Sequence, residues 1–130
     1  MTGTDDALGT VKRMFAAFEA GDLDGLLATV HPESHWTYYG ANPRLSSAEF
    51  SGHAAVRRFF ERILERLEMT VFDTDEFVVQ GDTVVIFGGE AGIVRSSGQP
   101  FRNVWTQKYT VKDGLIVEMA EYNIQVEPRG

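Results

Sequence analysis

Two glutamates in the second half of the chain have side chains that could move a proton. Glu121 lies in the apolar stretch Leu115–Ile124, where it shares one face of a predicted strand with Asn123. Glu90 lies in an earlier apolar stretch. If both face one apolar cavity, desolvation and mutual repulsion raise at least one pKa, and the two groups titrate together. Such a pair offers a proton donor and an acceptor near neutral pH, which suits acid–base chemistry on a carbonyl compound.

Other side chains in the same stretches could complete a binding site. Tyr38, Asn103, Gln107 and Asn123 could donate hydrogen bonds to a developing oxyanion. Aromatic and thioether groups would form the walls around a flat, apolar ligand. The expected wall residues are Met14, Trp36, Phe87, Trp105, Tyr109 and Met119. The sequence therefore predicts a small hydrophobic ligand as the partner.

The two glutamates also have purely structural interpretations. Glu121 could bond a backbone group or an arginine such as Arg95 or Arg102, because structural ion pairs also perturb carboxyl groups. The Gly88–Gly89 pair permits a β-bulge that would turn Glu90 outward. Both interpretations stay open at the level of the sequence.

Length and composition limit the class of protein. The 130 residues form one domain, 1–130, which is large enough to bury a core without disulfides. The absence of cysteine excludes thiolate metal ligands and a cysteine nucleophile. A net charge of −7 argues against nucleic acid as a partner. Residues 1–10 are polar and no apolar run reaches membrane-spanning length, so we expect no secretory segment, no membrane partner and a cytoplasmic location.

We expect neither a metal nor a cofactor. His31 and His35 are four apart, but Pro32 separates them at a predicted helix end, so they do not form a helical pair of ligands. No third ligand accompanies them in the sequence. The proposed chemistry needs only the carboxyl groups of the chain itself.

Apolar spacing predicts three helices in the N-terminal half. The first covers Asp5–Ala20 and the second runs from Leu23 to Val30. The third begins after a Ser51 cap and continues to Leu67, with a charged outer face rich in ion pairs at helical spacing. Residues 40–50 are expected to form a loop.

Alternating and apolar stretches predict five strands. They are Ser34–Tyr39, Met69–Gln80, Thr83–Val94, Phe101–Val111 and Leu115–Ile124. Asp113-Gly114 between the last two is a strong hairpin signal. The element order predicts an α+β fold, in which a cone-shaped, strongly bent antiparallel sheet carries three helices on its concave side. The cavity between them is the natural ligand site.

Three motifs resemble the nuclear transport factor 2 superfamily. They are Ala20-Gly21-Asp22-Leu23-Asp24-Gly25, Gly52 before the Val56-Phe59-Phe60 helix, and Asp113-Gly114-Leu115-Ile116 followed by Glu121-Tyr122. The chain is most similar to ketosteroid isomerases, SnoaL-like polyketide cyclases and limonene epoxide hydrolases. The resemblance covers nearly the whole chain and implies a cystatin-like α+β barrel and a homodimer formed through the convex sheet faces. It says little about chemistry, because this scaffold hosts enzymes, binding modules and transport adaptors.

The resemblance does not extend to ketosteroid isomerase chemistry. Those enzymes use a tyrosine, an aspartate base and a protonated aspartate, whose positions correspond here to Met14, Tyr38 and Gln107. A thioether cannot donate a hydrogen bond, and a tyrosine is a far weaker base than a carboxylate at neutral pH. We therefore do not expect a true ketosteroid isomerase.

The epoxide hydrolases offer a closer match to the two glutamates. Their two aspartates correspond to Glu121 and Glu90. The arginine between those aspartates falls on Gly88, and the tyrosine and asparagine that hold the water fall on Trp36 and Tyr38. Because the cation and the water clamp are missing, water addition to an epoxide is only the second alternative.

Two classes of function follow. The first is a SnoaL-like enzyme of isomerase or cyclase type, without a cofactor, in which Glu121 and Glu90 act on a polyketide- or terpenoid-like molecule. The second is a non-catalytic domain that binds a small ligand or mediates dimerisation. A closed aromatic cavity with the charged pair inside would favour the first class. A cavity filled by Trp105, Phe87 and Met119 would favour the second.

Overall fold

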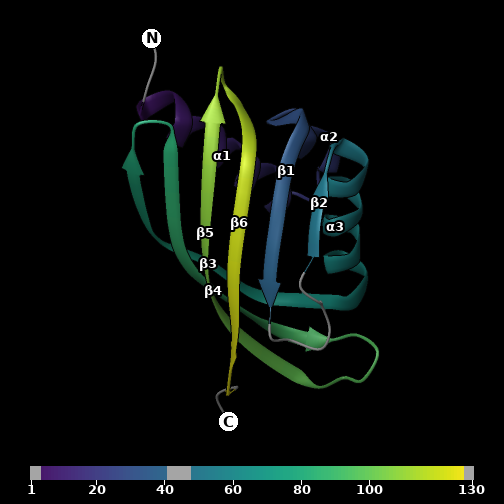
Figure 1. Ribbon diagram of the computed structural model, residues 1–130. Coiled ribbons are helices and arrows are strands. Elements are labelled where there is room, and N and C mark those ends of the chain that lie inside the picture. The colour runs from purple at the N-terminus through teal and green to yellow at the C-terminus, as the bar shows by residue number, and fades with distance from the viewer. Residues whose placement is uncertain (1–3, 41–47, 128–130) are drawn as a thin grey trace.

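Three helices lie on one side of a curved six-stranded sheet in the computed structural model (Figure 1). The structure describes residues 4–40 and 48–127, with side chains from Ala7 onward. The elements are α1 (Thr4–Glu19), α2 (Leu23–Leu27), β1 (Val30–Gly40), β2 (Ala48–Ser51), α3 (His53–Arg66), β3 (Leu67–Gln80), β4 (Thr83–Val94), β5 (Pro100–Lys112) and β6 (Leu115–Val126). No helix in these two ranges is long and apolar enough to cross a membrane.

The strands follow the order β2-β1-β6-β5-β4-β3. The cone-shaped α+β architecture with helices on the concave side is confirmed. The sheet is mixed rather than wholly antiparallel, because β1 pairs with β6 in parallel while all other neighbours are antiparallel. The chain between β1 and β6 contains α3 and four strands, and this long connection allows the two strands to run in the same direction.

Three local expectations were wrong. Ala48–Ser51 forms β2, which pairs with β1 at the edge of the sheet, so part of the expected loop is a strand. Ser51 is therefore a strand residue, and Gly52 occupies the N-cap of α3 without a side-chain hydrogen bond. The second helix ends at Leu27, because Val30 already begins β1. Residues 41–47, the rest of the expected loop, lie outside the described residues.

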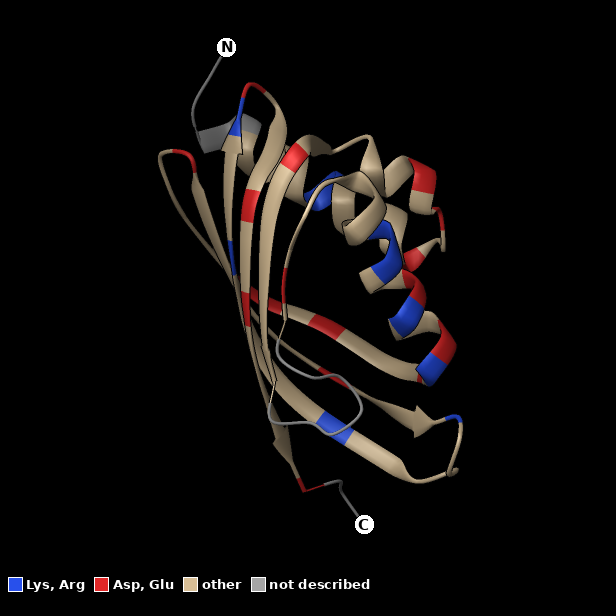
Figure 2. Cartoon of the chain, turned by 45° about the vertical axis from the view of Figure 1, so that its right-hand side comes forward, with Lys and Arg blue, Asp and Glu red and all other residues tan. Residues whose placement is uncertain are grey.

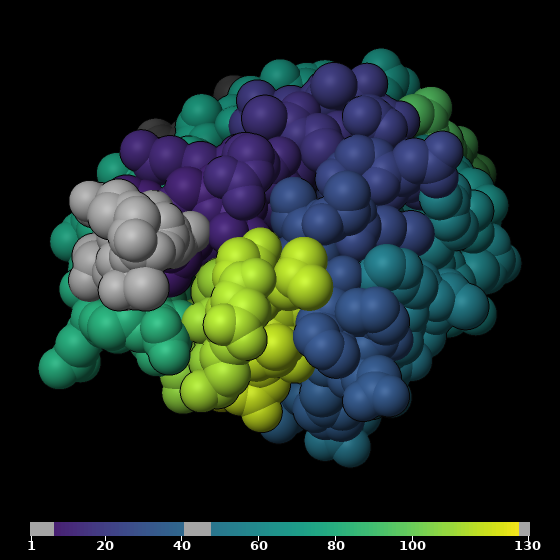
Figure 3. Space-filling model, turned by 90° about the horizontal axis from the view of Figure 1, so that it is seen from above, coloured from purple at the N-terminus to yellow at the C-terminus, as the bar shows by residue number. Residues whose placement is uncertain are grey.

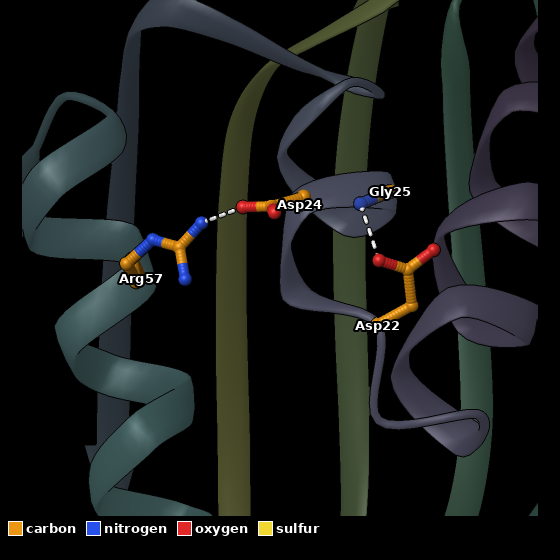
Figure 4. Close-up of polar contacts among 4 residues, drawn as sticks. All are labelled: Asp22, Asp24, Gly25 and Arg57. Carbon is orange, nitrogen blue, oxygen red and sulfur yellow. Dashed lines mark hydrogen bonds and ion pairs between the residues drawn. The ribbon is translucent and has the colours of Figure 1, made fainter.

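Two aspartates, Asp22 and Asp24, hold the short helix α2 in place (Figure 4). Asp22 caps it by accepting a hydrogen bond from the Gly25 backbone N–H at 2.9 Å. Asp24 forms an ion pair with Arg57 of α3. Basic and acidic residues alternate along the outer side of α3 (Figure 2), as the sequence predicted, with Arg58 contacting Glu61 and Glu65. The Asp24–Arg57 pair joins α2 to α3, whereas the Arg58 contacts lie within α3.

One end of the molecule is closed by contacts between α1, β1 and the β5–β6 hairpin. Thr10 donates to the carbonyl of Gly114 at 3.2 Å, and the Ile116 N–H donates to the Thr29 carbonyl at 2.8 Å. Seen from above, α1 in purple, β1 in blue and the hairpin in yellow-green cover this end (Figure 3). Beneath it lies the apolar core, in which Val11 and Met14 of α1 are fully buried.

The hairpin at Asp113-Gly114 and one irregularity close to it together set the register of β5 and β6. Both residues have positive φ, 53° and 77°, which is typical of the tight turn that the sequence predicted. The pairing shifts by one residue between Thr110 and Val111, and beyond this irregularity Gln107 lies opposite Glu121. The register therefore brings an amide and a carboxyl group together on the concave face.

Candidate active site

A cavity lies between the helices and the concave face of the sheet. The empty volume of the cavity, measured out to its open mouth, is about 500 Å³. The centre of a water molecule can occupy about 30 Å³ of this volume. The inner space thus holds about two water molecules. Nine of the residues expected in the site line it: Met14, Trp36, Tyr38, Glu90, Gln107, Tyr109, Met119, Glu121 and Asn123.

Glu121 is buried on β6 between two amides. Gln107 Nε2 donates to its Oε1 at 2.9 Å, and Asn123 Nδ2 donates to its Oε2 at 2.9 Å. Tyr109 donates its hydroxyl proton to Gln107 Oε1 at 2.7 Å, which fixes the orientation of that amide. No Lys, Arg or His lines the cavity in the described part of the chain, so the alternative of an arginine partner for Glu121 finds no support.

Glu90 faces the same cavity from β4. The register between β4 and β5 runs without a shift from Thr83 to Ile93, so no bulge on that side turns the glutamate outward. Its neighbour across the strands, Asn103, donates to Glu90 Oε2 at 2.8 Å. Asn123 Nδ2 lies 3.5 Å from the same oxygen and 2.9 Å from Glu121, so one amide joins the two carboxyl groups.

The surroundings of Glu121 shift its protonation toward neutral pH. Burial, and to a smaller extent the charge of Glu90, raise the pKa of Glu121 from 4.5 to about 7. The hydrogen bonds from Asn123 and Gln107 oppose this shift because they stabilise the carboxylate. Burial, and then Glu121, raise the pKa of Tyr109 well above its ordinary value. Tyr109 therefore stays protonated and acts as a donor.

Three of the predicted residues do not line the cavity. Phe87 is 42% exposed on the outer face, because β4 continues its regular alternation and points Ile86 and Gly88 inward. Trp105 is buried over Gly88 and stacks on Phe72, with ring centroids 5.5 Å apart, so it supports the wall from behind. Asn103 acts through its hydrogen bond to Glu90.

Sequence reasoning missed the part of the wall that comes from the helices and β3. These lining residues are Phe15, Phe18, Phe59, Phe60, Ile63, Leu67, Met69 and Phe72. Their apolar spacing identified the buried faces of α1 and α3, but such spacing does not separate a core side chain from one that borders a cavity. The resulting site combines an aromatic wall with one polar strip that runs across β4, β5 and β6.

The three positions that differ from ketosteroid isomerases all line the cavity. Met14, Tyr38 and Gln107 are each buried there. The cavity is thus the equivalent place in the fold, with a different set of polar groups. Tyr38 lies beside Glu121 in the parallel register of β1 and β6.

Comparisons with known proteins agree with this architecture. An NTF2-like protein from Burkholderia xenovorans is 30% identical, with a TM-score of 0.84, and the match covers 95% of this chain and 92% of that one. TerC, crystallised with polyporic acid, is 25% identical over 90% of each chain, with a TM-score of 0.74. A Mesorhizobium loti protein provisionally described as a SnoaL-like polyketide cyclase is 21% identical over 88% of this chain and 97% of its own.

The Mesorhizobium loti structure has a TM-score of 0.69 and, at that identity, shows the fold alone. No curated protein matches the sequence. The family model of the SnoaL-like domain matches residues 11–119, a range that contains every lining residue of the cavity except Glu121 and Asn123. Glu90 is inside the matched range, and Glu121 follows two residues after it. The chain therefore belongs to the SnoaL-like domain family.

Proposed function

We propose that this protein is a cofactor-independent acid–base enzyme of isomerase or cyclase type, acting on a small hydrophobic, polyketide- or terpenoid-like molecule in the cavity. The observation that carries the proposal is Glu121, a buried carboxyl group in an aromatic cavity whose pKa is raised to about 7. A group that titrates near the working pH exchanges protons efficiently in both directions. Its neighbour Glu90 helps to set that pKa.

In the proposed reaction Glu121 takes a proton from a carbon next to a carbonyl group. The electron pair of the broken C–H bond forms the C=C bond of an enolate, and the carbonyl oxygen takes up the negative charge. Where the substrate has a C=C bond conjugated with the enolate, Glu121 returns the proton to the far carbon of that system, so that the C=C bond moves and the net change is an isomerisation without oxidation or reduction. Gln107 has a second amide N–H beyond the one bonded to Glu121, and this group is a candidate donor to the oxyanion.

A non-catalytic ligand-binding or dimerisation domain is the alternative, and the narrow inner space of the cavity favours it. A polyketide-sized ligand requires flexible wall residues such as Met14 and Met69 to change rotamer. Epoxide hydrolysis has less support, because the described lining contains no arginine to bridge the glutamates.

We further propose that the protein is a homodimer that associates through the outer face of the sheet. Four exposed apolar side chains gather there on β4, β5 and β6, and we call them the outer patch: Phe87, Val104, Tyr122 and Ile124. They border a shallow hollow. An apolar patch of this kind marks a surface for association.

Carbon-detected NMR titration of the glutamate carboxyl groups tests the acid–base proposal. Glu90→Gln and Glu121→Gln supply the assignments. We expect Glu121 to titrate near pH 7, and its midpoint to fall in Glu90→Gln because the neighbouring charge is removed. Independent titration of both groups near the ordinary value of about 4.3 would remove the chemical basis of the proposal.

Turnover is tested by proton exchange. A panel of cyclic and aromatic ketones is incubated in D₂O, and the loss of α-hydrogen signals is followed by NMR. We expect enzyme-dependent exchange with at least one ketone and its loss in Glu121→Gln. Glu118→Gln, an exposed change on the same strand, is the matched control and should retain exchange.

A further inference from the structure

The polar strip of the cavity contains two amide oxygens that find no hydrogen-bond donor among the described residues. They are Asn123 Oδ1 and Asn103 Oδ1, and both are buried. Buried acceptors without a partner are costly, so each indicates a donor that the described part of the chain does not supply.

The orientation of the two asparagines follows from their neighbours. Asn123 Nδ2 lies against both glutamates, and Asn103 Nδ2 lies against Glu90. Rotating either amide by 180° would place its oxygen against a carboxyl oxygen, which is repulsive. The amide oxygens are therefore held away from the glutamates as free acceptors. Asn123 is only 5% exposed and lines the cavity, so its acceptor belongs to the ligand site.

The rest of the wall favours positive charge. The described lining contains two carboxyl groups and no Lys, Arg or His. It also contains the rings of Trp36, Tyr38 and Phe59, with Phe59 5.5 Å from Tyr38 and 6.4 Å from Trp36 between centroids. Aromatic faces attract cations, most strongly where water is excluded. An anion in the same place would meet two glutamates and no counter-charge.

We propose that the cavity selects apolar ligands that carry a protonated nitrogen, in preference to neutral or anionic ligands of the same shape. The ammonium group lies at the polar strip, where its N–H groups are donated to Glu121 and to Asn123 Oδ1, and the apolar part lies among the rings. The inner space, about 30 Å³ for water centres, suits a small polar head of this kind. The inference rests on the proposed function in taking this cavity as the substrate site, and it names the class of substrate.

Three ligands of nearly equal shape test the inference: benzylamine, benzyl alcohol and benzoate. Binding is measured at pH 8, where Glu121 is mostly ionised, by calorimetry and by the shifts of the Gln107 and Asn123 side-chain amides. We expect benzylamine to bind about tenfold more tightly than benzyl alcohol, and benzoate to bind most weakly. Glu121→Gln should remove most of the preference for benzylamine while leaving the affinity for benzyl alcohol unchanged. Glu118→Gln, on the exposed side of β6, should leave the preference unchanged.

Four results would each overturn the inference. They are equal affinity for benzylamine and benzyl alcohol, tighter binding of benzoate than of benzylamine, an unchanged preference for the amine in Glu121→Gln, and no binding of any of the three ligands. The result is separable from the proposed function. If Glu121 titrates near pH 7 and the protein catalyses proton exchange, but the wild type shows no preference for the amine, only the proposed class of ligand is overturned. An amine preference with an ordinary Glu121 titration and no exchange overturns catalysis and leaves a binding protein for amines.

Discussion

Gln107 and Glu121 face each other across β5 and β6, with Gln107 Nε2 2.9 Å from Glu121 Oε1 and both side chains buried. The carboxylate is thus solvated by neutral amides in place of water or a cation. Neutral donors stabilise the charge less than a counter-ion does, so burial and Glu90 still determine the direction of the pKa shift. This arrangement keeps a carboxyl group with a raised pKa inside an apolar cavity.

Glu121 should make the protein less stable as the pH rises from about 4.5 to about 7. Its folded pKa is raised, so in this window the folded state holds a proton that the unfolded state has lost. The penalty is complete above pH 7 and amounts to at most about 3 kcal/mol. Urea unfolding of the wild type and Glu121→Gln at pH 5 and pH 8 measures it. The variant should gain stability relative to the wild type on going to pH 8, and an unchanged difference would contradict the buried titration.

Tyr109→Phe should destabilise the protein by about 1–3 kcal/mol, because Gln107 Oε1 loses its donor in a buried place. The freed amide should hold Glu121 less well, so the pKa of Glu121 should rise further. Urea unfolding and the carboxyl titration measure the two effects. Tyr122→Phe is the matched control, since Tyr122 is half exposed, and its effect should stay within about 0.5 kcal/mol. Equal effects of the two variants would argue against the Tyr109–Gln107–Glu121 chain.

Gly88→Ala should cost about 1–3 kcal/mol of stability. A Cβ at this position would lie 2.5 Å from the Trp105 ring and 2.4 Å from the Asp73 carbonyl oxygen. Gly89→Ala is the control, because its nearest neighbour would be the Asn103 carbonyl oxygen at 3.4 Å. Thermal unfolding of the two variants should separate them clearly. If the two variants unfold at the same temperature, the packing of the Trp105 ring does not require the space above Gly88.

Ile124→Lys and Val104→Lys should shift the protein from dimer to monomer, because each places a charge in the outer patch. Analytical ultracentrifugation over a range of concentrations measures the change. Leu64→Lys is the control, since Leu64 is exposed on α3, away from the outer face of the sheet. A wild-type protein that sediments as a monomer at all concentrations would exclude the proposed homodimer.

The sequence by itself determined the helices, the meander of the last four strands and the turn at Asp113-Gly114. These features depend on local patterns, namely apolar spacing and turn residues. It also placed Glu121, Asn123 and Gln107 on one face, because alternation along a strand is a local property. The edge strand β2 escaped prediction, since four mostly exposed residues carry no apolar pattern of their own.

Only the tertiary structure decided what these residues contact. The direction of Glu90 depended on whether the Gly88–Gly89 pair forms a bulge, and an unbroken pairing with β5 turned it inward and Phe87 outward. The parallel pairing of β1 with β6 and the helical wall of the cavity both join segments far apart in the chain. The raised pKa of Glu121 has the same origin, because burial and the approach of Glu90 exist only after distant strands have come together.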